Sequence, residues 1–377
     1  MGTGALHPLR LVLAMSFALV FSCAVPAFSY QLVYPESLSD IKQGFDYVYN
    51  EEYEKAEDIF QRYIKKYPNN PEGYFFMTGR YAEQINAYHD SSRMDDLHKW
   101  ADITVRKAEA YNAQHPNDPV GYFYIGNTYG YLGLLEAQEQ HLVQAFMLSV
   151  KAKKNLEKAL EITPTLYDCH FGLGTLFYYA SRKHGEEGGV VGWIVKKFIT
   201  NDKDLRAEGI IMLRKAVSNG GITSDVAFSS LMWVLIAEGK IDEAYPMAQE
   251  MARRWPKDKH GQWAMGRILL LRGECGKASE HFEAVRQMVQ WQNTPLEKFP
   301  EIGLATELTA LCKNRNDWDK KKIDVAVYKL RQMLKQNPNI RIEYANSKGV
   351  VRDWSAMLER IDNQTFIESG DRHDTTH

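Results

Sequence analysis

Apolar residues recur at helical spacing along most of the chain, and prolines divide this pattern into units. Pro68, Pro116 and Pro164 are each 48 residues apart. The segments after the first two prolines also match, with Tyr74 and Tyr122 in the same register. Apolar positions three and four residues apart are typical of amphipathic helices, and a fixed period of this size is typical of repeat arrays. We therefore expect an all-α protein built of consecutive helix pairs.

A small residue falls in the first helix of most units and an alanine in the second. Gly44 and Ala56 are such a pair in the first unit, and Gly126 and Ala152 are such a pair in the third. Two helices approach closely where a small residue lies at their crossing. We therefore expect each glycine to face the alanine of the same unit, with large apolar residues around the contact.

This arrangement resembles the tetratricopeptide repeat (TPR), whose pattern combines a Gly and an aromatic residue in the first helix with an Ala, an apolar residue and a closing Pro in the second. The first unit carries all of them, as Gly44, Tyr47, Ala56, Phe60 and Pro68. The resemblance implies a right-handed α-solenoid of about seven TPR-like helix pairs between residues 35 and 338, with a C-terminal capping helix. Residues 168 to 256 also look similar to a little-characterised group of TPR-like proteins, which suggests no chemistry.

Two units are longer than the usual repeat. Those ending at Pro116 and Pro164 span 48 residues, about 14 more than the roughly 34 of a TPR unit. At about 3.6 residues per turn this excess equals nearly four helical turns, which preserves the face that each helix presents. We expect elongated helices rather than inserted loops, and the stretch from Ala137 to Lys154, free of Gly and Pro, is expected to continue as helix.

These patterns divide the chain into six segments. Before the array lies a targeting segment, and a long atypical unit with a Gly-rich insertion separates two sets of TPR-like repeats. A capping helix and a polar tail follow. In order, the segments are 1–29 (signal peptide), 35–164 (N-terminal repeats), 165–221 (atypical repeat), 222–338 (C-terminal repeats), 339–367 (capping helix) and 368–377 (tail).

The N-terminus has the order of a secretory signal peptide. Arg10 precedes an apolar run from Leu11 to Phe21, and small residues at Ala27 and Ser29 form a cleavage site. Eleven residues are too few to span a bilayer, which takes about 20, so we expect an exported, periplasmic protein whose mature chain begins at Tyr30. An alternative remains open, because the residues before Cys23 resemble a lipobox and would anchor the chain to the outer membrane through that cysteine.

Charge and cysteine content exclude several classes of protein. The net charge is -2, which gives no reason to expect a general nucleic-acid binder. Beyond Cys23 the chain holds Cys169, Cys275 and Cys312, whose spacing matches no metal or redox motif. We expect these three to be buried structural thiols, and three cysteines cannot all pair within one chain.

Motifs for chemistry are missing from the sequence. We find no phosphate-binding loop, no GxSxG, no HExxH and no CxxC. His89, Asp90, Asp95, Asp96 and His98 could be drawn as a metal cluster, but they fall where one helix should end and the next begin, which favours a solvated turn. We therefore expect no enzyme, no catalytic residue, no bound metal and no cofactor.

Aromatic residues provide the best functional lead. In TPR-like geometry several should face a concave groove that binds a protein or peptide partner. The alternative is that the elongated helices wind tightly and bury these rings as core. The candidate groove residues are Phe75, Phe123, Asn127, Phe171, Tyr178, Trp193 and Trp263.

The expected function is therefore that of an exported scaffold or adaptor for protein–protein interaction. Two alternatives remain at this point: an outer-membrane lipoprotein-type assembly factor, and a carrier of an apolar small molecule. The segment from Gly185 to Ile199 adds a specific expectation, because its glycines precede Trp193 and Phe198. We expect these two side chains to be covered by docking over the concave side as a lid, with a membrane surface or a partner as the other covers.

Overall fold

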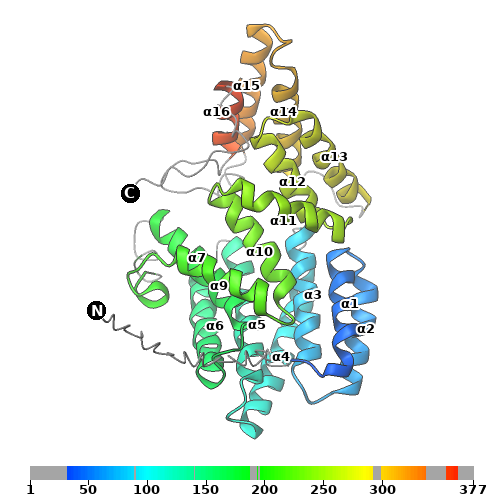
Figure 1. The fold of residues 1–377 in the computed structure, drawn as a ribbon, viewed down its shortest axis with the longest axis vertical. Helices are drawn as coiled ribbons and strands as arrows, with labels where there is room; N and C mark the ends of the chain where they lie inside the picture. The colour runs from blue at the N-terminus through cyan, green and yellow to red at the C-terminus, as the bar shows by residue number, and fades with distance from the viewer. Residues whose placement is uncertain are drawn as a thin grey trace, which may run out of the picture.

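The computed structural model describes residues 32–88, 91–139, 141–186, 193, 196–291, 299–336 and 354–363, and the regular elements among them are all helical (Figure 1). The helices follow one another in pairs: α1 (Leu38–Tyr49) with α2 (Tyr53–Lys66), α3 (Glu72–Tyr88) with α4 (Met94–Gln114), α5 (Val120–Gln138) with α6 (Leu142–Ile162), α7 (Cys169–Glu186) with α9 (Arg206–Asn219), α10 (Ser224–Ala237) with α11 (Ile241–Arg254), α12 (Lys259–Leu271) with α13 (Cys275–Trp291), and α14 (Pro300–Asn314) with α15 (Lys320–Gln336). Shorter elements are η1 (Pro35–Ser37), η2 (Ser91–Arg93), the π-helical turn η3 (Lys196–Thr200) and the last helix α16 (Trp354–Asn363).

Each helix packs mainly on its neighbours in sequence, as a helical repeat array requires. The first helices of successive pairs also contact one another, so that α3, α5, α7 and α10 form an inner layer. Their sequences explain this position, because α3 and α5 carry apolar or small residues on most sides, whereas α2 and α11 have one polar face. A helix that is apolar all round must be covered all round.

The predicted helix crossings occur, but in three units the residue that the glycine faces was predicted wrongly. A Cβ on Gly126 would lie 2.6 Å from Cγ of Leu156, and one on Gly44 would lie 2.5 Å from the ring of Phe60. Gly266 faces Phe282 in the same way. In these three units the glycine thus faces the large residue four positions after the alanine, so a glycine is needed because a bulky side chain fills the crossing. In the α7–α9 pair, Gly174 faces Gly209 instead, so two small residues meet there as predicted.

Elongated helices account for the 48-residue units, as predicted. Helices α4 and α6 have 21 residues each, against 14 in α2 and α11. The expectation of unbroken helix from Ala137 to Lys154 is wrong, since α5 ends at Gln138 and α6 begins at Leu142. Neither Gly nor Pro marks this turn, and the backbone N–H groups of Glu139 and His141 instead bond carbonyls in the last turns of α5.

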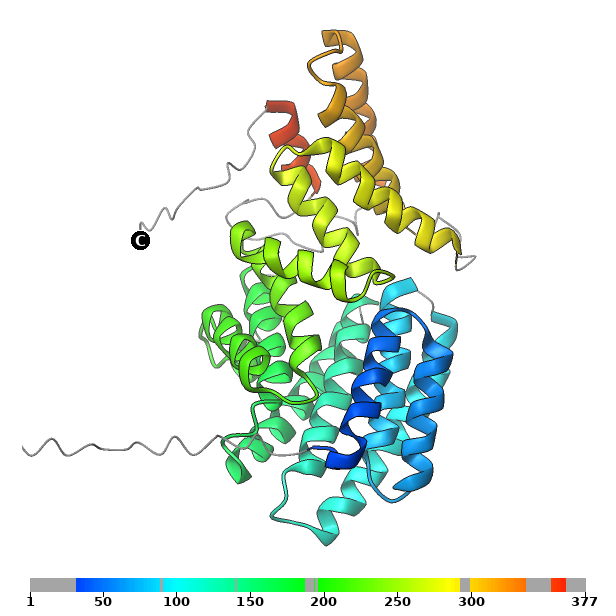
Figure 2. The same cartoon turned by 45° about the vertical axis from the view of Figure 1, so that its right-hand side comes forward.

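The start of the array contacts the α11–α12 turn through ionic groups, which places residues about 200 positions apart side by side (Figures 1 and 2). The indole N–H of Trp255 donates to the carboxylate of Asp46 at 2.8 Å. Lys257 pairs with Glu52 at 2.7 Å, and buried Lys259 pairs with buried Glu51. We call these contacts, with the His260–Glu83 pair at 3.1 Å, the closing contacts.

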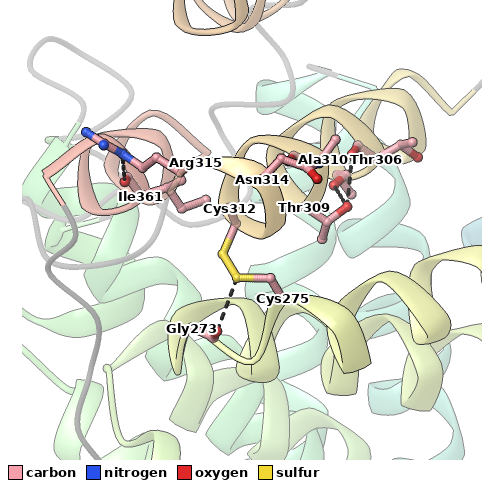
Figure 3. Close-up of a disulfide and its surroundings, with 10 residues drawn as sticks. Gly273, Cys275, Thr306, Thr309, Ala310, Cys312, Asn314, Arg315 and Ile361 are labelled. Carbon is pink, nitrogen blue, oxygen red and sulfur yellow. Dashed lines mark hydrogen bonds between the residues drawn. A yellow bond between two sulfur atoms is a disulfide. The ribbon is translucent and has the colours of Figure 1, made fainter. Parts of the chain in front are cut away.

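The last helices lie at the opposite end of the long axis from α4, α5 and α6 (Figures 1 and 2). A disulfide joins Cys275, at the start of α13, to Cys312 in α14, with their Cα atoms 5.8 Å apart (Figure 3). The expectation that both are thiols is therefore wrong, while Cys169 is a buried thiol as expected. The sequence could not show this pairing, because the two cysteines are 37 residues apart and only helix packing brings them together.

Helix α16 packs on α14 and α15 and buries Leu358 and Ile361. The guanidinium of Arg315 donates to the carbonyl oxygen of Ile361 at 3.0 Å (Figure 3), which satisfies one of the free carbonyls at the end of α16. A helix therefore lies at Trp354–Asn363, within the range where a capping helix was expected, and the remainder of residues 339–367 lies outside the described residues.

Candidate functional site

Two of the predicted groove residues, Phe75 and Phe123, meet in the inner layer. Their ring centroids are 6.2 Å apart, and Phe75 also contacts the rings of Tyr124 at 5.1 Å and Tyr131 at 5.8 Å. Both phenylalanines are buried, as is Tyr124. In the described structure these rings are core residues that hold α3 against α5, which is the alternative that the sequence left open.

Three other predicted groove residues, Asn127, Phe171 and Tyr178, are buried as well. The side-chain amide of Asn127 donates to the carbonyl of Phe123 at 3.1 Å. A Cβ on Gly172 would lie only 2.8 Å from Oδ1 of Asn127. The absence of a side chain at Gly172 therefore lets α7 approach α5 at this point. Tyr178 donates to Glu238 at 2.9 Å. These side chains join helices of the array together.

The last two predicted residues, Trp263 and Trp193, are more accessible. Trp263 is half-buried on α12, with its ring 4.9 Å from that of Phe282. It packs against two clusters of buried apolar side chains, one centred on the helices before α9 and one on the helices from α10 onward. Trp193 lies in the insertion and is 56% exposed. The seven predicted residues therefore do not form one continuous surface.

A short segment before η1, which we call the strap (Leu32, Val33 and Tyr34), contacts the inner layer. Leu32 and Val33 are buried, and the hydroxyl of Tyr124 donates to the carbonyl oxygen of Leu32 at 2.6 Å. The ring of Tyr34 stacks on Tyr67 at the end of α2, with centroids 4.1 Å apart. The strap therefore lies between the end of α2 and the first turns of α3 and α5, held mostly by side chains.

A buried carboxyl group lies beside the strap. Asn70 donates to the hydroxyl of Tyr34 at 2.9 Å and to Oε1 of Glu72 at 3.5 Å. Burial raises the pKa of Glu72 to about 7, against the weaker opposing effect of its hydrogen bonds to backbone and to Asn70. The sequence analysis missed the strap, although an apolar pair followed by Tyr34 and Pro35, shortly after the expected cleavage site, was the available signal.

A different surface exposes large apolar side chains, and we call it the exposed patch (Val143, Phe146, Met147, Trp193 and Phe198). Val143 is 69%, Met147 51%, Trp193 56% and Phe198 55% exposed. The rings of Phe146 and Phe198 meet edge-on at 6.1 Å, which joins α6 to the insertion. The expectation that Trp193 and Phe198 are covered as a lid is wrong, because both side chains are more than half exposed, whereas Ile199 is buried.

The closing contacts contain several buried ionisable groups with shifted pKa values. Burial raises the pKa of Glu51 and lowers that of Lys259, and their mutual attraction opposes both effects. The ammonium of Lys259 lies 3.5 Å from the centre of the Tyr88 ring, and the hydroxyl of Tyr88 donates to Glu51. Glu51 and Lys259 each have an opposite charge beside them, and Lys259 also has the Tyr88 ring. We therefore interpret the cluster as a structural ion-pair network.

His260 pairs with Glu83 in the same cluster. Burial alone would lower the pKa of His260, but the hydrogen bond and charge of Glu83 and the charge of Asp258 outweigh it and raise the pKa to about 9. Asp258 caps α12 by accepting from the backbone N–H of His260 at 2.9 Å. The imidazole is therefore cationic at neutral pH and joins α3 to α12.

Metal and membrane features were searched over the described ranges. No group of three His, Cys, Asp or Glu side chains that could hold a metal ion occurs there. Asp95, Asp96 and His98 lie in the first turns of α4, while His89 and Asp90 fall outside the described residues. Within the same ranges, no helix combines the length and the apolar character needed to cross a bilayer.

Comparison with known proteins does not name a family. No protein-family model matches the chain, and no curated protein matches it significantly. The Cys275–Cys312 disulfide points to an oxidising compartment. In the part that the structure describes, the chain is an all-helical protein of consecutive packed helix pairs.

Proposed function

We propose that this protein is an exported, TPR-like scaffold, a right-handed α-solenoid that binds an extended segment of a partner protein against the ends of α2, α3 and α5. The observation that carries this proposal is the strap, which occupies the same place in the chain itself. Leu32 and Val33 are buried there, and Tyr124 holds a main-chain carbonyl of the strap.

The strap is recognised in a way that another chain could reproduce. It makes no strand pairing, and its fixed points are a hydroxyl donor to the main chain, two apolar contacts and a stacked tyrosine. Tyr34 has extended backbone angles, φ -64° and ψ 131°. A partner segment with two aliphatic residues followed by Tyr offers the same groups, so it would compete with the strap for this site.

The expected compartment is consistent with a scaffold protein of the cell envelope. The signal peptide expected at residues 1–29 and the disulfide in the last helices both fit export to an oxidising space. Lipidation at Cys23 would place the same scaffold on the outer membrane, as an assembly factor, without changing the site. A carrier of apolar molecules is less favoured, because Phe75, Phe123 and Tyr124 pack on one another. The proposal includes no catalytic step, metal or cofactor.

Peptide binding tests the proposal. A synthetic peptide of residues 30–37 is titrated into the mature protein and into a variant that lacks residues 30–34, with affinity read by fluorescence anisotropy. We expect the shortened variant to bind the peptide. The intact protein should bind it at least about tenfold more weakly, because the tethered strap competes at high effective concentration.

Two controls keep the test decisive. The same peptide with Tyr34→Ser should bind more weakly, since it loses the ring stacked on Tyr67. Leu32→Ser with Val33→Ser in the full mature chain loosens the strap without shortening the protein. If both altered proteins keep their helical circular dichroism and cooperative melting but bind no peptide, the proposed site is wrong.

A further inference from the structure

The exposed patch is built by two elements that are distant in sequence. Val143, Phe146 and Met147 lie three and four residues apart on α6, and therefore on one face of that helix. The ring of Phe198 contacts Phe146, and Trp193 precedes it in the insertion. The patch is thus an assembled surface of large side chains, and not a set of scattered exposed residues.

The insertion is fixed so that its largest side chains point outward. Ile199 and Thr200 of η3 are buried, and η3 packs on α7 and α6. Trp193 and Phe198 nevertheless remain more than half exposed. Among the described residues of the insertion, Trp193 and Phe198 thus offer a large apolar area to something outside the described chain.

Positive charge lies beside the patch on α6 and at Lys197. The exposed face of α6 continues from Val143 and Met147 to Lys151 and Lys154, which follow at helical spacing. Between Glu139 and Glu157 the sequence contains no acidic residue. In the insertion, the ammonium of Lys197 lies 5.2 Å from the centre of the Trp193 ring. This local excess contrasts with the net charge of -2 for the whole chain.

We propose that the exposed patch docks the protein onto an anionic lipid surface. Trp and Phe side chains are well suited to the boundary between headgroups and acyl chains, and lysines beside them attract anionic headgroups. The lysines favour a lipid surface over an uncharged apolar protein surface. An anionic membrane supplies acyl chains for the aromatic side chains and negative headgroups for the lysines. Docking would leave the strap and the inner layer free to engage a partner.

Vesicle sedimentation tests this proposal on the full mature protein. The vesicles contain phosphatidylcholine alone or phosphatidylcholine mixed with phosphatidylglycerol. We expect binding to the anionic vesicles that weakens with salt, and little binding to the neutral ones. Trp193→Ser with Phe198→Ser should reduce the affinity for anionic vesicles by about tenfold or more, since both side chains lose their apolar insertion. Lys151→Glu with Lys154→Glu should reduce binding to the anionic vesicles specifically.

A matched control exists on α15, where Val325 is 60% and Tyr328 65% exposed. Val325→Ser with Tyr328→Ser removes a similar exposed apolar area elsewhere and should leave vesicle binding unchanged. Equal losses in the two pairs of variants would overturn the assignment of the patch, and so would the absence of binding to anionic vesicles. If the patch variants lose a protein partner while the intact protein ignores vesicles, the surface is a protein interface and the lipid proposal is wrong.

Discussion

The two ends of this protein are tied to the rest of the array in different ways. At the N-terminal end, ion pairs such as Glu51–Lys259 join the first two helix pairs to the α11–α12 turn, across about 200 residues of sequence. At the C-terminal end, a disulfide joins α13 to α14 across 37 residues, and α16 covers the last pair. One connection is long-range and ionic, whereas the other is short-range and covalent.

The two connections differ because the exposed face of each terminal helix pair is covered in a different way. A repeat at the end of an array has one uncovered face, which must be capped or packed elsewhere. The N-terminal pairs are covered by a later helix pair, so their stability depends on the intervening pairs being folded. In the described chain the α14–α15 pair is followed by α16 alone, and a covalent link and this helix stabilise it locally. Breaking each connection should therefore affect different helices.

The largest effect is expected from Lys259→Met. This change removes the cation that pairs with buried Glu51, and an uncompensated buried charge costs about 3–5 kcal/mol. We expect the free energy of unfolding to fall by about that amount, with loss of hydrogen-exchange protection in α1, α2 and α12. Chemical denaturation and hydrogen exchange measure the two effects.

Two variants sharpen this result. Glu51→Leu added to Lys259→Met removes both charges and should recover much of the lost stability, because apolar replacement of a buried pair is often neutral. Lys257→Met removes an exposed pair with Glu52 in the same contact and should cost only about 1 kcal/mol or less. Equal losses from Lys257→Met and Lys259→Met would mean that burial of the pair does not matter.

The second largest effect is expected from Cys275→Ser combined with Cys312→Ser. Loss of the disulfide should lower stability by about 2–4 kcal/mol, since the unfolded chain regains the freedom of the closed loop. Reduced protection in hydrogen exchange should appear in α13, α14 and α16 and spare α1 and α2. A reductant should destabilise the parent protein and leave the double variant unchanged, while a uniform loss over all helices would contradict the local role of this bond.

A third, smaller effect concerns packing inside a helix pair. Gly126→Ala places a Cβ 2.6 Å from Cγ of Leu156, and overpacking of this kind costs about 1–3 kcal/mol. Gly130, one turn later on α5, has no atom within 4 Å of its Cβ position. Gly130→Ala should therefore stabilise the helix by about 0.4–1 kcal/mol. Melting temperatures that move the same way in both variants would contradict the crossing seen at Gly126.

Helix pairs could be predicted from this sequence because each depends on local spacing. The period set by Pro68, Pro116 and Pro164 and the helix lengths of the long units are both local features. The turn between α5 and α6 was missed, because it uses neither Gly nor Pro. The closing contacts and the disulfide were missed for a different reason, since they depend on how whole helices pack on one another, which no local spacing gives.

The candidate sites were predicted less well than the fold. Phe75 and Phe123 were predicted to face one groove, and their rings do meet, but as buried core residues. Their burial depends on how closely α3 and α5 approach, which no local pattern gives. Trp193 and Phe198 were predicted to be covered as a lid, and both are exposed instead. The neighbouring stripe on α6 was not predicted, because Val143 and Met147 look like ordinary core positions in sequence.

The smallest expected effect is a pH dependence of the closing contacts, which the disulfide does not share. The pKa of His260 is raised to about 9 by Glu83 and Asp258 despite burial, against about 6.5 in the unfolded chain. Its contribution to stability is therefore complete below pH 6.5 and falls as pH rises to about 9. Since His260 is partly exposed, we expect a contribution of about 1 kcal/mol. His260→Gln should remove this slope, and subtracting its unfolding free energy from that of the parent cancels the titration of Lys259. A difference that stays constant between pH 6 and 9 would show that the imidazole is not held as a cation.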